Sequence, residues 1–351
     1  MPVRRPEKVN PSMMDVARHA GVSIATVSNV VNRPQLVSEA TAERVRASID
    51  ELGFVRNDAA RALATGKNQS LGMVLADLDN SLFVDMAHGA QQSSDSAGMR
   101  LILGNSACDI SRQEDYLDLF DEARVAGVLL APMEDSRVGI ERMRAHGRSI
   151  VLLNFVQEGS DCCTVLVDNE MVGYLAARHL IEQGRRRIAF ISAKEYYQPV
   201  HARHAGVRRA VDESPDTTLE EIHTEGLVFA DGRNVARELA RRPLSLVPDG
   251  VVAVTDELAN GLVTGLTAWS DLRVPHEVAV VGCEDNRSAR SGPVPLTTVQ
   301  LAGVAMGEAA AALLLEELSA GPEHVHRTVV LPPHVEIRSS SSLESSELVQ
   351  L

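Results

Sequence analysis

The sequence predicts an α/β protein with a small all-helical head and a two-lobed body built from parallel sheets. Three observations lead to this prediction. Residues 12–53 contain three short stretches of helical periodicity, each preceded by a residue that can cap a helix. From Leu71 onward, short apolar runs alternate with helical stretches, which is typical of parallel sheets. A chain of 351 residues is also too long for one ordinary core, so two or three domains are expected.

The distribution of charge changes near residue 70, where the periodicity of the apolar residues also changes. Residues 1–70 hold ten Lys and Arg against seven Asp and Glu, a net charge of +3, whereas the rest of the chain carries −17. A basic segment joined to an acidic body suits a module that contacts nucleic acid and a second module that stays away from the polyanion. The 44% hydrophobic and 23% charged residues are typical of a soluble globular protein.

Several classes of protein do not fit the sequence. No stretch approaches the roughly 20 apolar residues of a membrane span. The basic N-terminus lacks the apolar core of a secretory signal, so we expect a cytoplasmic protein without a membrane partner. No Gly-rich phosphate loop and no metal-binding His or Cys spacing is present, so we expect no enzyme, no cofactor and no metal site. The cysteines are expected to be reduced, mostly buried thiols: Cys108, Cys162, Cys163 and Cys283.

The first two helices of the head have the pattern of a helix-turn-helix unit. Ser12 and Asp15 can form a capping box, and Gly21 follows where a tight turn needs it. The apolar face of the first helix carries Met13, Val16, Ala17 and Ala20. Ser23 can cap the second helix, whose inward face carries Val27, Val30 and Val31. Its other face is small, polar and uncharged, so it could fit a DNA groove closely: Ala25, Thr26, Ser28 and Asn29.

A third helix follows between Ser38, its expected cap, and Gly53. Its apolar stripe is formed by Thr41, Val45, Ile49 and Leu52. Periodicity alone leaves a second interpretation open, in which these helices are part of a larger helical domain that does not bind DNA.

The stretch DVARHAGVSIATVSNVVNRPQLVSEATAERV closely resembles the DNA-binding head of the lactose repressor/galactose repressor family. The resemblance implies a helix-turn-helix domain over residues 11–56. It also implies base-reading positions at Ile24, Ala25 and Asn29, with further DNA contacts from Thr26, Ser28 and Asn32. Relatives often have Arg in place of Asn29, yet an Asn amide can bond adenine in a bidentate manner.

Residues 57–68 correspond to the linker that forms a short helix on DNA in this family. There the implied DNA contacts are Asn57, Ala60 and Leu63, and Leu63 takes the place of the family's minor-groove wedge. The alanines favour a helix, but about two turns are not stable alone, so ordering only on DNA is expected. A bare Ala-rich linker is the alternative.

The body contains eight short apolar runs that predict strands in two βα-repeating lobes. They lie at 71–76, 100–104, 127–131, 149–153, 163–167, 188–192, 250–254 and 278–282. Segments such as VDNEMVGYLAARHLIEQGRRRIAFIS and VVAVTDELANG resemble the same family, and hence periplasmic sugar-binding proteins. The resemblance implies a periplasmic-binding-protein-like fold with an effector between the lobes. The expected N-terminal lobe is 69–167 with 297–323, the C-terminal lobe is 168–296 with 324–340, and 341–351 is a disordered tail.

By the same resemblance, the effector contacts are Asn80, Phe83, Asn154, Arg203, Leu227, Asp256 and Glu284. An Arg and carboxylates at the ends of strands suit a polyhydroxyl ligand, because charged groups bond hydroxyls strongly. A salt-bridge network that closes the cleft is the alternative for any one of them. Leu227 stands where many relatives have an aromatic ring, and Tyr196 or Tyr197 could supply a substitute.

Together these observations predict a sequence-specific DNA-binding transcription regulator of the repressor type. We expect a homodimer on a pseudo-palindromic operator, controlled by a sugar or related polar metabolite. The tail lacks a leucine heptad, so a tetramer is not expected. Two alternatives remain, namely a stand-alone solute-binding protein and a regulator whose cleft no longer senses an effector.

Overall fold

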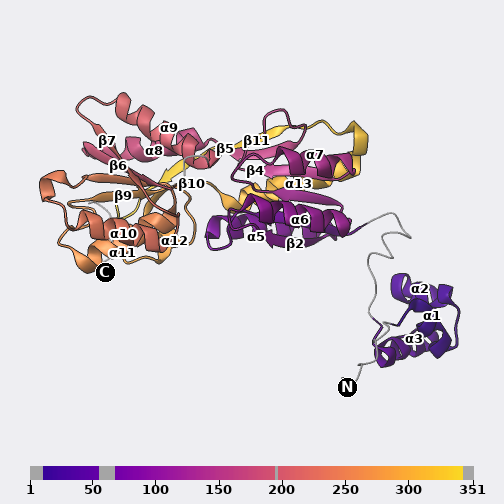
Figure 1. Ribbon diagram of the computed structural model, residues 1–351. Helices are drawn as coiled ribbons and strands as arrows, with labels where there is room; N and C mark the ends of the chain where they lie inside the picture. Colours follow the sequence, from indigo (N-terminus) through magenta and orange to yellow (C-terminus); the bar gives the residue numbers. More distant parts are fainter. Residues whose placement is uncertain (1–10, 55–67, 194–196, 343–351) are drawn as a thin grey trace, which may run out of the picture. The chain divides into compact units, whose positions relative to one another are not determined.

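The computed structural model describes residues 11–54, 68–193 and 197–342 (Figure 1). They fall into two compact units, one within residues 1–67 and the other within residues 68–351. The first unit is the helical head, and the second contains both lobes of the body. No helix in the described part of the chain is long and apolar enough to cross a membrane.

The head folds as its caps and periodicity predict. Its helices are α1 (Met13–Ala20), α2 (Ile24–Asn32), the short η1 (Pro34–Leu36) and α3 (Glu39–Leu52). The capping box forms, because Ser12 Oγ accepts a bond from the Asp15 amide at 3.3 Å and Asp15 Oδ2 accepts one from the Ser12 amide at 2.9 Å. Gly21 ends α1 at φ 64°, the left-handed region in which a glycine is least strained.

The three helices of the head share one small core. Its buried residues are Val16, Ala17, Ala20, Val27, Val30, Ala42 and Val45. The prediction that the Ser38 side chain caps α3 is wrong. Its hydroxyl makes no bond to the backbone of α3 and donates to Thr41 Oγ1 at 3.0 Å instead.

The N-terminal lobe is a six-stranded parallel sheet in the order β11-β5-β4-β3-β1-β2. Its strands are β1 (Ser70–Leu75), β2 (Arg100–Asn105), β3 (Gly127–Leu130), β4 (Ser149–Leu153), β5 (Cys163–Val167) and β11 (Thr328–Leu331). Its helices are α5 (Ser81–Ser96), α6 (Ile110–Glu122), α7 (Arg137–Ala145), α13 (Gly303–Ala320) and the short η3 (Gly321–Glu323).

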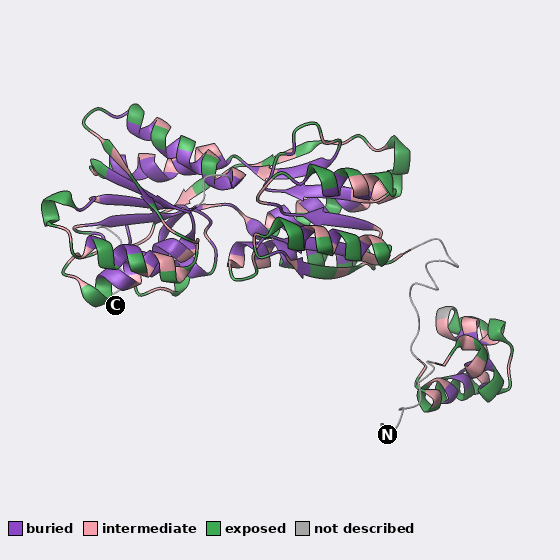
Figure 2. Ribbon diagram, viewed as in Figure 1, coloured by how far each residue is buried: buried purple, intermediate pink, exposed green. Residues whose placement is uncertain are grey.

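The C-terminal lobe repeats this arrangement in the order β12-β10-β9-β8-β6-β7. Its strands are β6 (Arg187–Ser192), β7 (Thr218–His223), β8 (Gly250–Ala253), β9 (Ala279–Gly282), β10 (Thr297–Gln300) and β12 (His334–Glu336). Its helices are α8 (Asn169–Glu182), α9 (Gln198–Asp212), α10 (Phe229–Leu239), η2 (Leu244–Leu246), α11 (Asp256–Trp269) and α12 (Ser288–Ser291). In both lobes, buried strands lie between helices whose outer faces are exposed (Figure 2).

All eight predicted apolar runs are strands, but four further strands lacked a recognisable run. The edge strand β7 reads TLEEIH and is only partly buried, so its residues show no continuous apolar stretch. The expectation of parallel sheets needs one correction, because β12 runs antiparallel to β10.

The predicted lobe boundaries are also corrected near the C-terminus. β10 pairs with β9, so 297–300 belongs to the C-terminal lobe, and β11 pairs with β5, so 328–331 belongs to the N-terminal lobe. The chain therefore crosses between the lobes three times, after β5, after β10 and after β11 (Figure 1).

The expected tail begins later than predicted. Ser341 is buried and its hydroxyl donates to Thr297 Oγ1 at 2.6 Å, and Ser342 is also buried. These contacts join the end of the described chain to the C-terminal lobe. The remainder of the predicted tail, 343–351, lies outside the described residues.

Helices α8 and α9 pack unusually closely, and two glycines make this possible. A Cβ atom on Gly173 of α8 would overlap the carbonyl oxygen of Arg203 in α9, and one on Gly206 of α9 would overlap the carbonyl oxygen of Glu170 in α8. This contact fixes the position of α9, and with it the backbone of Arg203, against α8.

Candidate functional site

The outer face of α2 carries the predicted base-reading residues. Val27 and Val30 are buried against the other head helices, whereas Ile24, with 48% of its surface exposed, and Ala25 face solvent. Ser28 and Asn29 are half-buried at the side of this face. Val27 and Val30 therefore face inward as predicted, whereas Val31, also predicted to face inward, is only half-buried.

The amino end of α2 is suited to approach a phosphate. Its first turn contains no acidic residue, and Ser23 caps it by accepting a bond from the Thr26 amide at 3.1 Å. The predicted contact Thr26 also bonds the Ser23 hydroxyl at 2.9 Å, so part of its polar capacity serves the cap. Free amide groups and the positive end of the helix dipole favour an anion at such a position.

Four predicted DNA contacts cannot be placed. Asn57, Ala60 and Leu63 lie outside the described residues, and Asn32 is the last residue of α2 with a side chain that is not described.

A cavity of about 400 Å³ lies between the two lobes of the body. Loops that follow the carboxyl ends of strands in both sheets line it, which is the usual place for a ligand in such α/β folds. Six of the seven predicted effector contacts line it: Asn80, Phe83, Asn154, Arg203, Leu227 and Glu284.

The seventh, Asp256, is placed differently from the prediction. It does not line the cavity, and its side chain is fully buried behind the wall. Its Oδ1 accepts a bond from Thr298 Oγ1 at 2.7 Å, and its Oδ2 accepts one from the Asn286 amide at 3.0 Å. Burial raises its pKa to about 6. In this conformation Asp256 supports the loop that carries Glu284 rather than contacting the cavity.

Arg203 presents a buried guanidinium to the cavity from α9. Its Nε donates to Asn169 Oδ1 at 3.0 Å, and its Nη1 donates to the carbonyl oxygens of Val254 and Cys283 at 2.6 and 3.2 Å. The same Nη1 lies 3.7 Å from Glu284 Oε1. Because the carbonyls that directly follow β8 and β9 accept its hydrogen bonds, the guanidinium group is held in one position.

Glu284 joins the two lobes through hydrogen bonds. It follows β9 in the C-terminal lobe and accepts bonds from Asn80 Nδ2 of the N-terminal lobe at 2.9 and 3.1 Å. Asn286 Nδ2 donates to it at 2.8 Å. Burial raises the pKa of Glu284 to about 8, and the nearby Asp256 carboxylate adds to this shift, although Arg203 opposes it.

The sequence did not identify several residues that line the cavity. Phe229 lies two residues beyond Leu227 and supplies an aromatic ring near the position where Leu227 had suggested that one was lost. Tyr197, proposed as a substitute ring, also lines the cavity, whereas Tyr196 lies outside the described residues. Thr255 and Glu257, on either side of Asp256, also line the cavity and were not predicted. The sequence does not show which of these three neighbouring side chains face the cavity, because that depends on the orientation of the first turn of α11.

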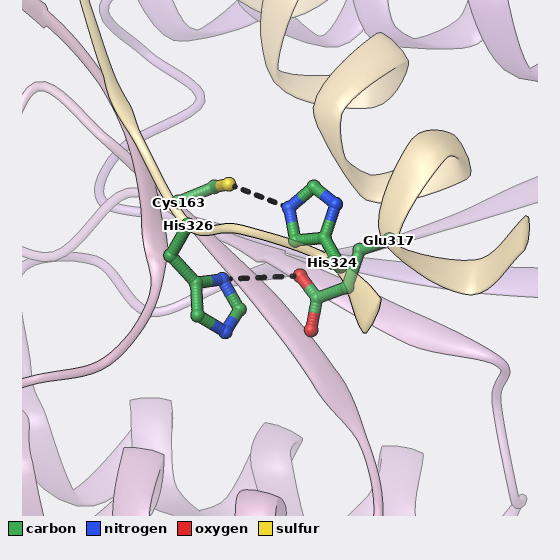
Figure 3. Close-up of side chains that lie close together, drawn as sticks. All are labelled: Cys163, Glu317, His324 and His326. Atoms are coloured by element: carbon green, nitrogen blue, oxygen red, sulfur yellow. Dashed lines mark hydrogen bonds and ion pairs between the residues drawn. The ribbon is translucent and has the colours of Figure 1, made fainter. Parts of the chain in front are cut away.

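A second cluster of chemically active side chains lies elsewhere, at the amino end of β5. It consists of Cys163, Glu317, His324 and His326, whose ligand atoms all lie within 4.8 Å of one another (Figure 3). The sequence predicted no metal site because Cys163 and His324 are 161 residues apart and share no short motif.

The head surface and the cavity between two sheets define a ligand-binding regulator that contacts DNA. Residues 12–57 match the family described as bacterial regulatory proteins, lacI family, and residues 177–341 match the periplasmic binding protein-like domain. The HTH-type transcriptional repressor PurR of Vibrio atlanticus is 30% identical over 334 residues, which cover 94% of this chain and 98% of that protein. PurR of Pectobacterium carotovorum subsp. carotovorum is 31% identical over 333 residues, covering 93% and 96%.

Solved structures agree with these relatives. A complex of the transcriptional regulator CelR with cellobiose has a TM-score of 0.68 and 27% identity, covering 95% of this chain and all of that one. The lac repressor dimer bound to operator has a TM-score of 0.78 at 22% identity, covering 95% and 99%, and supports the fold. The chain belongs to the lacI family of bacterial regulatory proteins and is a DNA-binding transcription regulator.

Proposed function

We propose that the protein is a homodimeric repressor in the bacterial cytoplasm whose affinity for a pseudo-palindromic operator is set by a small polar molecule held between its lobes. The observation that carries the proposal is the cavity of about 400 Å³, which both lobes line and into which Arg203 projects. A ligand there contacts both lobes at once, so it binds one lobe arrangement better than another. The relatives are regulators, which favours action by binding rather than by catalysis.

The charges around the cavity favour a neutral, hydroxyl-rich effector over an anion. Arg203 is accompanied by four further acidic side chains besides Glu284, on Asp77, Asp79, Glu225 and Glu257. Carboxylates accept bonds from hydroxyl groups but repel phosphate and other anions. Aromatic rings at Phe83, Tyr197 and Phe229 can pack against the apolar faces of a sugar ring.

Two of the related structures contain neutral sugars. The CelR complex contains cellobiose, and a regulator from Enterococcus faecium, 27% identical with a TM-score of 0.69 over 78% of this chain and 98% of that one, contains ribose. These ligands have the chemistry that the lining of the cavity favours.

The experiment compares operator binding by the wild-type and Arg203→Ala proteins, with and without an effector. A thermal-shift screen of neutral sugars and their phosphate esters first identifies the effector, and we expect only neutral compounds to raise the melting temperature. Arg203→Ala should bind the operator with nearly unchanged affinity but should lose the response to the effector. Arg208→Ala, on the exposed side of the same helix, is the control and should respond normally.

Because Arg203 is buried, Phe83→Ala provides a second test of the cavity that leaves the guanidinium in place. An unchanged effector response in both variants would remove this cavity from the mechanism. Loss of operator binding without any ligand would make Arg203 a structural residue.

A regulator that no longer senses a ligand is the second candidate. The bonds from Asn80 and Asn286 to Glu284 favour it, because they satisfy the carboxylate and connect the lobes without a ligand. The same screen decides between the two, since this candidate predicts no stabilising compound and an operator affinity that Asn80→Ala changes directly.

A further inference from the structure

We propose that Cys163, Glu317, His324 and His326 form a zinc-binding site at the edge of the N-terminal lobe opposite the effector cavity. The proposal does not depend on the proposed effector. Three segments that are remote in the sequence supply the ligands, namely the first residue of β5, the last turns of α13 and the loop that leads into β11 (Figure 3).

The distances between the side chains match a shared metal ion. In a tetrahedral zinc site with bonds near 2.0–2.3 Å, neighbouring ligand atoms lie about 3.3–3.6 Å apart. Cys163 Sγ lies 3.1 Å from His324 Nε2, and His326 Nδ1 lies 3.9 Å from Glu317 Oε2. All four ligand atoms lie within 4.8 Å of one another, so side-chain movements of about 1 Å bring them to tetrahedral separations.

Two of these atoms are buried without a hydrogen bond. Among the described residues, His326 Nδ1 and Glu317 Oε2 have no hydrogen-bond partner. Buried polar atoms without partners are costly and rare in folded proteins, and a bound ion would satisfy both. The two atoms point toward each other, with their side chains only 19% and 13% exposed (Figure 3).

The surroundings also resemble those of metal-binding histidines. A ligating histidine usually directs its other ring nitrogen at a carboxylate, which fixes the ring and its tautomer. Here His324 Nδ1 lies 3.6 Å from Glu316 Oε1, and His326 Nε2 lies 4.0 Å from Asp161 Oδ1.

The two nearby guanidinium groups are neutralised, so they do not repel a cation strongly. Arg327 pairs with both oxygens of Glu316 at 2.7 and 2.6 Å, and Arg144 pairs with Asp161 at 3.1 Å. A surface groove of about 540 Å³, lined by Glu317, His324 and His326 among others, gives an ion access from solvent.

The donor set selects zinc among the common divalent ions. One thiolate and one carboxylate balance the charge of the ion, and two neutral imidazoles complete four ligands. Calcium and magnesium prefer oxygen ligands only, so they would not use Cys163.

The site lies at the end of the sheet where β1, the first strand of the body, begins. All strands of this sheet are parallel, so the amino end of β5 lies at the same edge as Ser70, where β1 begins directly after the linker. The effector cavity is at the other edge, beyond the carboxyl ends of the strands. Zinc would therefore bind independently of the effector and tie α13 and β11 to β5.

The test is a titration of the EDTA-treated, reduced full-length protein with Co²⁺, followed by displacement with Zn²⁺. Tetrahedral cobalt bound to a thiolate absorbs in the visible region and shows a sulfur-to-metal charge-transfer band in the near ultraviolet. We expect both bands to saturate at one ion per chain and to disappear when zinc is added. Cys163→Ser should abolish the charge-transfer band, and His326→Ala should weaken zinc binding by at least about tenfold.

Cys162→Ser is the matched control, because Cys162 is the adjacent thiol and bonds Arg144 instead of the histidines. It should keep both bands. Far-ultraviolet circular dichroism shows whether each variant is folded, and the fluorescence of the single tryptophan, Trp269, checks the other lobe. Absence of the charge-transfer band in the folded wild-type protein, or its persistence in Cys163→Ser, would overturn the proposal.

Discussion

Asn29 is the predicted base-reading residue of α2 whose side chain can form a bidentate contact with a base. It lies at the side of the exposed face of α2, and its amide can both donate to and accept from adenine. Asn29→Ala should weaken operator binding by about 1–3 kcal/mol and relax the preference at one base pair per half-site. Fluorescence anisotropy with the operator and its single-base variants measures both effects, with Glu43→Ala on the exposed face of α3 as the control. An equal loss on every sequence would identify Asn29 as a phosphate contact.

Glu284 should make the stability of the body depend on pH. Its pKa is raised from 4.5 to about 8 in the folded state, so folding favours the protonated group. The stabilisation is complete below the unfolded pKa of 4.5 and is lost as the pH rises through 8. The free energy of unfolding should fall by on the order of 4 kcal/mol between about pH 5 and pH 8.

Urea unfolding followed by Trp269 fluorescence measures this pH dependence. Glu284→Gln should flatten the curve, because an amide replaces the protonated carboxyl group and does not titrate. Glu225→Gln is the control, since this residue also lines the cavity but is exposed. An equally steep curve for Glu284→Gln would assign the dependence to another group.

Arg203 and Glu284 were predicted from their resemblance to effector contacts of the family, and both line the cavity. The position of Asp256 could not be predicted, because only the packing against Thr298 decides that it faces inward. The zinc-binding cluster could not be predicted from the sequence for a related reason. Its residues are far apart in the chain, and only the pairing of β5 with β11 brings them together.

At the scale of elements, the close contact between α8 and α9 depends on the absence of a side chain at Gly173 and Gly206. Gly173→Ala places a methyl group against the backbone of Arg203, so the helices must separate. We expect a loss of roughly 3 kcal/mol in the free energy of unfolding, because the obstacle is backbone and cannot rotate away. Gln183→Ala, at the exposed end of α8, should change stability by less than about 0.5 kcal/mol.

Because Arg203 itself is the residue displaced, Gly173→Ala should also weaken effector binding. Urea unfolding and the thermal-shift response to the effector report the two effects separately. A stability equal to that of the Gln183→Ala protein would show that the two helices are less tightly packed than the structure indicates.

Elements with a strong local pattern were predictable from sequence, and those defined by their neighbours were not. The buried strands β3 and β8 are continuous apolar runs, whereas β7, at a sheet edge, is only partly buried and contains two consecutive glutamates. β10 and β11 were assigned to the wrong lobes, because strand pairing is a long-range property that no single segment encodes.

For the whole molecule, we expect a stable homodimer on DNA. A head with one short recognition helix makes few contacts, and two heads related by a two-fold axis match the symmetry of a pseudo-palindrome. Light scattering of the full-length protein with and without a duplex operator measures the assembly. A single chain bound stably to one half-site would contradict the prediction.

The threefold crossing between the lobes has a consequence for how the protein is made. The segment 297–342 supplies β10 and β12 to one sheet and α13 and β11 to the other. Until the ribosome has released this segment, β5 and β9 are open edge strands, and neither lobe can complete its sheet. Domains commonly fold in order as they emerge during synthesis, but here both lobes must wait for the same late segment. The nascent chain is therefore exposed to misassociation and to chaperones until this segment has emerged, and both lobes reach their native form together.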